Sequence, residues 1–156
     1  EKKLIEDICP THKDLLYITG WVDKSSFKVY STNALASLIF YDAIDLNHWL
    51  CAPNRLYNSL LLGLPIICGS NPPMDNVVSK NCVGVVCNGA IPSSDTVYSA
   101  ILQVKRDFDS IRPRVRAAAE IYLWDSQLKT LDALLAIVSK GPLERPNYDQ
   151  RKDRCA

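Results

Sequence analysis

The chain has 156 residues, of which 47% are hydrophobic, and 18 Lys and Arg against 17 Asp and Glu give a net charge of +1. A chain of this length can bury about 70% of the surface that it exposes when unfolded, so we predict one main core. A protein that binds nucleic acid needs a basic surface, so the balanced charge argues against a nucleic-acid partner. No apolar run reaches the ~18 residues of a transmembrane segment.

Short apolar runs of strand length occur four times in the chain, at residues 15–18, 36–41, 65–68 and 83–87. Each run is nearly continuous rather than alternating, which is typical of parallel strands that are covered on both faces. Helical segments are predicted between the runs, at residues 25–32, 53–62 and 74–80. This alternation predicts an α/β, Rossmann-like fold with a mostly parallel sheet of about four strands flanked by helices.

The six cysteines are widely spaced, without a Cys-x-x-C pair or a zinc-type His spacing. Cys68 and Cys87 fall inside apolar runs, so we predict that they are small buried side chains in a reducing compartment. No apolar stretch of the signal-peptide type follows the charged N-terminus. We therefore expect a cytoplasmic protein, with peripheral contact at the inner membrane face left open.

After Gly89 the pattern changes from alternating strands and helices to helices alone. The first is predicted to begin near Ser93 or Ser94, whose hydroxyls can cap free amides, and two more amphipathic segments cover residues 112–122 and 125–139. Gly141 and Pro142 are expected to stop the last one. We assign residues 1–139 to one unit and 140–156 to a charged tail that is mobile or packs on a missing domain.

The segment beginning at Ala52 carries the strongest chemical signal. Pro53 suits the first position of a helix, and Ala52 before it offers no side-chain oxygen to the amides of Asn54 and Arg55. Those amides, the helix dipole and the Arg55 guanidinium together predict a phosphate or diphosphate site. Asn58 lies four residues after Asn54 on the same face and can reach towards a ribose. The alternative is a surface helix whose start is capped by water.

The loop before this helix carries a second group of polar residues. Asp42, Asp45 and His48 follow a predicted strand, at the edge where open α/β sheets bind ligands. A metal site is conceivable there, but solvated loop residues are the commoner case, and we predict no metal. His48 is also a candidate for contact with the phosphate or with a bound sugar.

Several motifs together resemble the C-terminal domain of GT-B glycosyltransferases that use nucleotide sugars. Residues 53–58 followed by Gly63-Leu64-Pro65 are similar to the family's Pro-Asn-Lys and Gly-Leu/Met-Pro signature. Further segments fall in matching order, at residues 17–22, 34–41, 81–86 and 122–125. The similarity spans about residues 1–139, and this collinearity makes it more specific than any single motif.

The resemblance implies that residues 1–139 are a partial donor-binding Rossmann-like domain of a hexosyltransferase, as in surface polysaccharide or glycoconjugate synthesis. The nucleotide-sugar diphosphate would lie at Ala52, Pro53, Asn54 and Arg55, with the ribose near Asn58. Base or sugar contacts would come from a set of residues at the ends of two strands and in the following loop: Gly20, Trp21, Val22, Tyr41, Asp42 and His48. No metal or other cofactor is expected, because this family neutralises the leaving diphosphate with helix dipoles and basic side chains.

Two departures from the family pattern bear on activity. Asn58 stands where relatives carry an acidic residue that accepts the ribose hydroxyls, and Leu50 stands where many carry a second one. The acceptor domain and two further strands of the donor domain are also expected to be missing, so we expect no turnover by this chain alone. The alternative function is a non-catalytic nucleotide- or phosphate-binding module that acts as a scaffold.

Overall fold

The computed structural model describes residues 21–31 and 33–139. Three short parallel strands form one sheet in the order β1 (Ser37–Ile39), β2 (Ile66–Cys68) and β3 (Gly84–Val86). The α/β class and the parallel pairing are thus confirmed, with a three-stranded sheet in the described chain rather than about four strands. The strand predicted at residues 15–18 lies outside the described residues.

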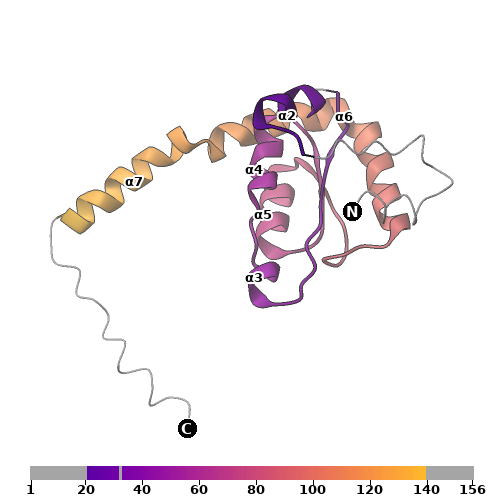
Figure 1. Cartoon of the computed structure of the whole chain (residues 1–156), viewed down its shortest axis with the longest axis horizontal. Coiled ribbons are helices and arrows are strands. Elements are labelled where there is room, and N and C mark those ends of the chain that lie inside the picture. Colours follow the sequence, from indigo (N-terminus) through magenta and orange to yellow (C-terminus); the bar gives the residue numbers. More distant parts are fainter. Residues whose placement is uncertain (1–20, 32, 140–156) are drawn as a thin grey trace, which may run out of the picture.

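Six helices accompany the sheet in the described residues: α2 (Lys24–Ser31), α3 (Leu46–Trp49), α4 (Asn54–Leu61), α5 (Pro72–Asn81), α6 (Ser94–Tyr122) and α7 (Trp124–Ser139). Figure 1 shows α4 and α5 on one side of the sheet, with the short α3 below them. The first part of α6 rises on the other side, and its later part crosses the top of the molecule towards α4. The sheet is therefore covered on both faces, as its continuous apolar strands require.

The core lies between the middle strand and the helices. All three residues of β2 are fully buried. The predicted apolar ridge is confirmed, because Leu56 and Leu60 of α4 and Leu64 just after it are buried. Cys68 and Cys87 are buried free thiols, as predicted, and Cys68 lies within β2. Burial of the apolar side chains of this core is the main stabilising contribution to the fold, at about 1.5–3 kcal/mol for each large aliphatic or aromatic side chain.

Two glycines meet different backbone needs in this packing. A Cβ atom added to Gly84 would lie 1.7 Å from the carbonyl oxygen of Ile66 on the neighbouring strand, so no side chain fits there. Gly63 follows α4 with a φ of +70°, the left-handed conformation that favours glycine at helix ends. The prediction that Gly63 ends this helix is therefore confirmed.

The long helix α6 begins as predicted but does not stop where expected. The Ser93 hydroxyl accepts a hydrogen bond from the backbone N–H of Thr96, at 3.3 Å. The separate helix predicted from residue 112 is wrong, because α6 continues without a break through Pro113 to Tyr122. A proline inside a helix removes one backbone hydrogen bond and bends the axis, and Figure 1 shows α6 changing direction along its length.

Helix α7 projects from the rest of the described chain and makes its main contact with α6 (Figure 1). It begins one residue earlier than predicted, at Trp124, and Leu123 before it has an extended backbone. The predicted stop at Gly141 and Pro142, and the charged tail, lie outside the described residues. Within residues 21–31 and 33–139, no helix combines the length and the apolar character that crossing a membrane demands.

Candidate functional site

The start of α4 is exposed and has no side-chain cap. Pro53 itself is the N-cap, with φ −70° and ψ 147°, and Asn54 is the first helical residue. The prediction of Pro53 as first helical residue with Ala52 as N-cap is therefore wrong by one position, because the ψ of Pro53 is extended rather than helical. Ala52, Asn54 and Arg55 are exposed and Pro53 is buried. We call these four residues the α4 tip.

The Arg55 guanidinium at the α4 tip has no hydrogen bond or ion pair within the described chain, although the Arg55 carbonyl accepts one from the Ser59 hydroxyl at 2.7 Å. Pro53 accepts a backbone bond from Leu56, which leaves the amides of Asn54 and Arg55 at the exposed end of the helix. A free cation beside uncapped amides is the arrangement that an anion such as phosphate satisfies.

The loops that follow the three strands meet at one edge of the sheet. The backbone N–H of Gly69 donates to the carbonyl of Ile39, the last residue of β1, and that of Ser70 donates to the carbonyl of Gly89, so the loop after β2 is tied to the end of β1 and to the loop after β3. This edge is the carboxyl end of all three strands, where α/β proteins bind ligands. The α4 tip follows the loop after β1 and therefore opens from this end of the sheet.

Asn71 holds these loops in place, and this role was not predicted from the sequence. It is fully buried, and its Nδ2 donates to the carbonyl oxygens of Tyr41 at 3.4 Å and of His48 at 3.2 Å. Its Oδ1 is buried and has no hydrogen-bond partner within the described residues. The available signal was an asparagine just after a buried strand and before the Pro72-Pro73 pair that opens α5.

Asp45 and His48 form a local pair next to Asn71. One Asp45 carboxylate oxygen, Oδ1, accepts from the His48 backbone N–H at 2.8 Å and lies 2.8 Å from His48 Nδ1. The backbone N–H of His48, followed by its imidazole, lowers the pKa of the Asp45 carboxyl below its ordinary value. This pairing caps α3 and fixes the ring, so that Nε2 is the imidazole nitrogen left for another partner.

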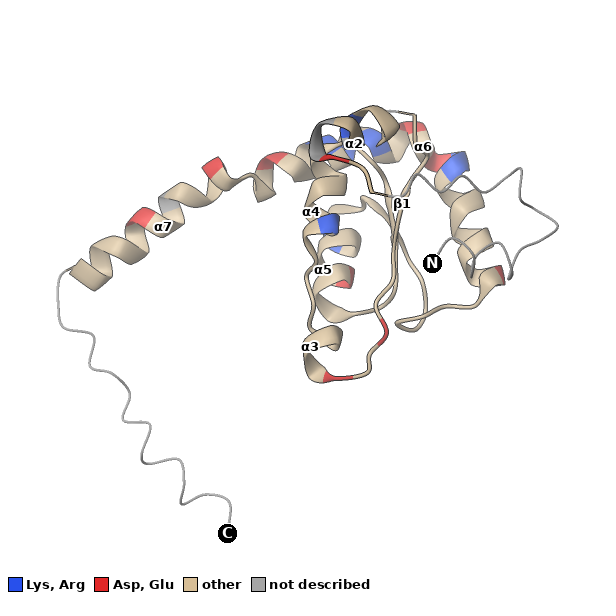
Figure 2. Ribbon diagram, viewed as in Figure 1, with Lys and Arg blue, Asp and Glu red and all other residues tan. Residues whose placement is uncertain are grey.

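The remaining candidates are spread over a wider area. Asn58 is exposed one turn along α4 from Asn54, and Asp42 is exposed in the loop that leads into α3, where the ribbon in Figure 2 is coloured for acidic residues. No three His, Cys, Asp or Glu side chains of the described chain gather in a way that could hold a metal ion. Trp21 is 98% exposed and Val22 is half-buried. Gly20 lies outside the described residues.

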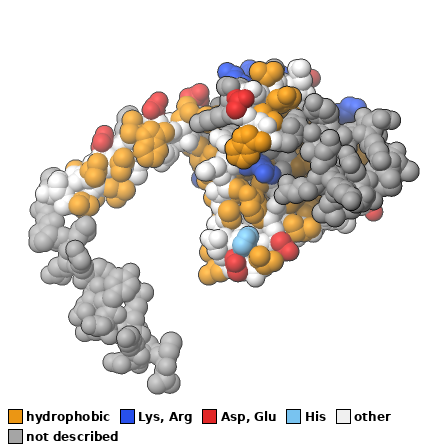
Figure 3. Space-filling view, viewed as in Figure 1, with side chains coloured by type: hydrophobic (Ala, Val, Ile, Leu, Met, Phe, Trp, Pro, Cys, Tyr) orange, Lys and Arg blue, Asp and Glu red, His pale blue; other side chains and the backbone are white. Residues whose placement is uncertain are grey.

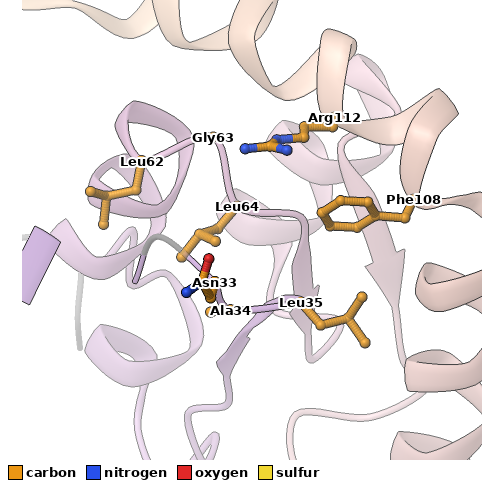
Figure 4. A pocket seen from close by; sticks show the side chains of 8 residues that line it. All are labelled: Asn33, Ala34, Leu35, Leu62, Gly63, Leu64, Phe108 and Arg112. Atoms are coloured by element: carbon orange, nitrogen blue, oxygen red, sulfur yellow. The ribbon is translucent and has the colours of Figure 1, made fainter. Parts of the chain in front are cut away.

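A cavity of about 340 Å³ lies elsewhere, between the residues before β1, the end of α4 and the middle of α6 (Figure 4). Arg112 lies over the Phe108 ring, 5.7 Å from its centroid, and in Figure 4 its guanidinium extends towards Gly63. This cavity opens at the amino ends of the strands, and no residue of the α4 tip lines it. Parallel sheets bind ligands at the opposite edge, so the position of this cavity in the fold does not make it the favoured site.

Comparison of the chain with protein-family models, with curated proteins and with solved structures gave no significant match.

Proposed function

We propose that the α4 tip binds the diphosphate of a nucleotide sugar and that the chain is the donor-binding half of a hexosyltransferase. The observation that carries the proposal is the uncapped, exposed helix start at the carboxyl end of the sheet, with an Arg55 guanidinium that has no partner among the described residues. The collinear resemblance to GT-B donor domains supports the same function.

The proposed reaction develops negative charge on the diphosphate, which the proposal places at the α4 tip. The bond between the sugar C1 and the β-phosphate oxygen breaks, the acceptor hydroxyl oxygen bonds to C1, and the acceptor proton leaves to a base. Negative charge grows on the departing diphosphate, and preorganised N–H donors and a guanidinium stabilise such charge more in the transition state than in the ground state. The base and the acceptor site are assigned to no residue of this chain.

The direct test is titration calorimetry of the whole chain with UDP, GDP and ADP. We expect one nucleotide to bind and Arg55→Ala to weaken it by about 1.5–3 kcal/mol, the usual cost of losing a hydrogen bond to a charged group. Lys105→Ala is the matched control, because Lys105 is an exposed cation on α6. Absence of binding by all three nucleotides, or equal losses in the two variants, would overturn the proposal.

The second candidate is a phosphate-binding module without transfer activity, and the amide at Asn58 favours it. An amide lacks the charge that strengthens carboxylate bonds to ribose hydroxyls. Such a module should bind inorganic pyrophosphate as tightly as any nucleotide, whereas a donor site should prefer one nucleotide. In the donor site Asn58→Glu should tighten nucleotide binding, and unchanged or weaker affinity would show that the ribose contact is wrongly assigned.

A further inference from the structure

Helix α7 carries an apolar stripe that nothing in the described chain covers. The stripe consists of Trp124, Leu128, Leu131, Leu135 and Val138, whose side chains are 38–69% exposed. Figure 3 shows apolar side chains along the projecting helix, with acidic side chains along one of its edges. Trp124 follows the extended residue Leu123, so α7 stands as a helix separate from α6.

The spacing within the stripe favours a helical partner. Its residues follow one another at intervals of four, three, four and three, which is the repeat that brings one face of a helix against another helix. Leu134 widens the stripe on one side. The 16 residues of α7 give a seam of about 24 Å, since a helix rises by about 1.5 Å per residue.

The charged residues beside the stripe indicate which kind of partner surface it can bind. Asp125 and Asp132 lie along one edge and are exposed, while Gln127 and Leu134 border the other edge. Neither border carries Lys or Arg in the sequence of α7. An amphipathic helix that binds an anionic membrane needs Lys or Arg beside its apolar face, so this edge disfavours a lipid surface.

The charges at the edge of the stripe also disfavour a second copy of the chain as the partner. In an antiparallel pair of α7 helices, Asp125 would face the partner's Asp132, and like charges at such positions repel. In a parallel pair, Asp132 would face the partner's Gln127, so the second α7 would offer no Lys or Arg at the bordering positions. We propose that α7 binds an amphipathic helix of a partner whose own apolar stripe is bordered by Lys or Arg.

Calorimetry of the whole chain with two synthetic helices tests this. The peptides share a leucine stripe of about three heptads and differ only in carrying Lys or Glu at the bordering positions. We expect the Lys peptide to bind on the order of tenfold more tightly at low salt, with a gap that narrows as salt rises. Asp125→Asn combined with Asp132→Asn should close the gap, whereas Asp109→Asn, an exposed change on α6, should not.

Two further measurements distinguish binding at the α7 stripe from unfolding and from self-association of the chain. Binding should blue-shift Trp124 fluorescence, and Trp124→Phe assigns that signal against the other tryptophans. Leu131→Asn should abolish binding without altering the thermal unfolding of the body, because α7 makes its main contact with α6 alone. Equal binding of both peptides, no binding, or self-association of the chain that Leu131→Asn removes would overturn the proposal, the last by showing that a second copy covers the stripe.

Discussion

The side-chain amide of Asn71 donates a hydrogen bond to the backbone carbonyl of His48, at 3.2 Å, and so ties the start of α5 to the end of α3. A second bond from the same Nδ2 reaches the Tyr41 carbonyl. One buried amide therefore positions the loop that leads to the α4 tip.

Asn71→Ala should destabilise the fold by about 2–3 kcal/mol, because it leaves two carbonyl oxygens without a donor in a buried place. Chemical denaturation measures the change in the free energy of unfolding. Asn47→Ala, an exposed change on α3, is the matched control and should stay within about 0.5 kcal/mol of the unmodified chain. Equal effects would show that the Asn71 bonds contribute little.

Gly84→Ala and Gly63→Ala should differ in severity although the change is the same. The Gly84 methyl would overlap the Ile66 carbonyl oxygen and force β2 and β3 apart, so we expect loss of the folded state or a destabilisation above about 3 kcal/mol. At Gly63 the added methyl has space and meets only the cost of its positive φ, about 1–2 kcal/mol. Thermal unfolding of both variants checks the order, and a milder effect at Gly84 would contradict the strand packing.

The pairing of Asp45 predicts a pH dependence with a definite sign. The pKa of the folded-state carboxyl is lowered, so its contribution to stability is present above the unfolded-state pKa of about 3.9 and is lost as pH falls through the lower folded value. Carboxyl NMR should show the lowered pKa directly. In His48→Ala the pKa should rise only part of the way back, because the largest cause is the backbone N–H, which remains; complete return would assign the effect to the imidazole.

Thiol reactivity should separate the cysteines by burial. Burial raises the pKa of the Cys68 thiol to about 12, so almost none of the reactive thiolate is present at pH 8. Cys82 is exposed. Alkylation of the folded chain with iodoacetamide, followed by peptide mass mapping, should modify Cys82 in the folded chain and Cys68 only after unfolding. Early modification of Cys68 would mean that the sheet opens readily.

The sequence predicted the elements that depend on local pattern. The three described strands and the Leu56 ridge follow from continuous apolar runs, and the start of α6 follows from the Ser93 cap. The sequence context of Asn71 was a usable signal, but its hydrogen-bond partners could not be predicted, because they are carbonyl groups 30 and 23 residues away in the chain. The continuation of α6 through Pro113 was also missed, since local rules favour a break that tertiary packing overrides.

The site was predicted in a similar way. The α4 tip depends on neighbouring residues, and sequence placed its start within one residue. The Asp45 and His48 pair was named as a candidate, but not its capping geometry. Ligand contacts of Arg55 and Asn58 stay predictions.

Tyr122, at the end of α6, lies with its ring centroid 5.7 Å from that of Tyr57 on α4, and its hydroxyl accepts from Asn81 of α5 at 3.3 Å. During synthesis, α4 and α5 leave the ribosome before Tyr122 does, so both helices are made before their contacts with Tyr122 can form. Until then the nascent chain must hold α4 and α5 without their last neighbour, so its apolar surfaces stay open to chaperones until α6 has been synthesised.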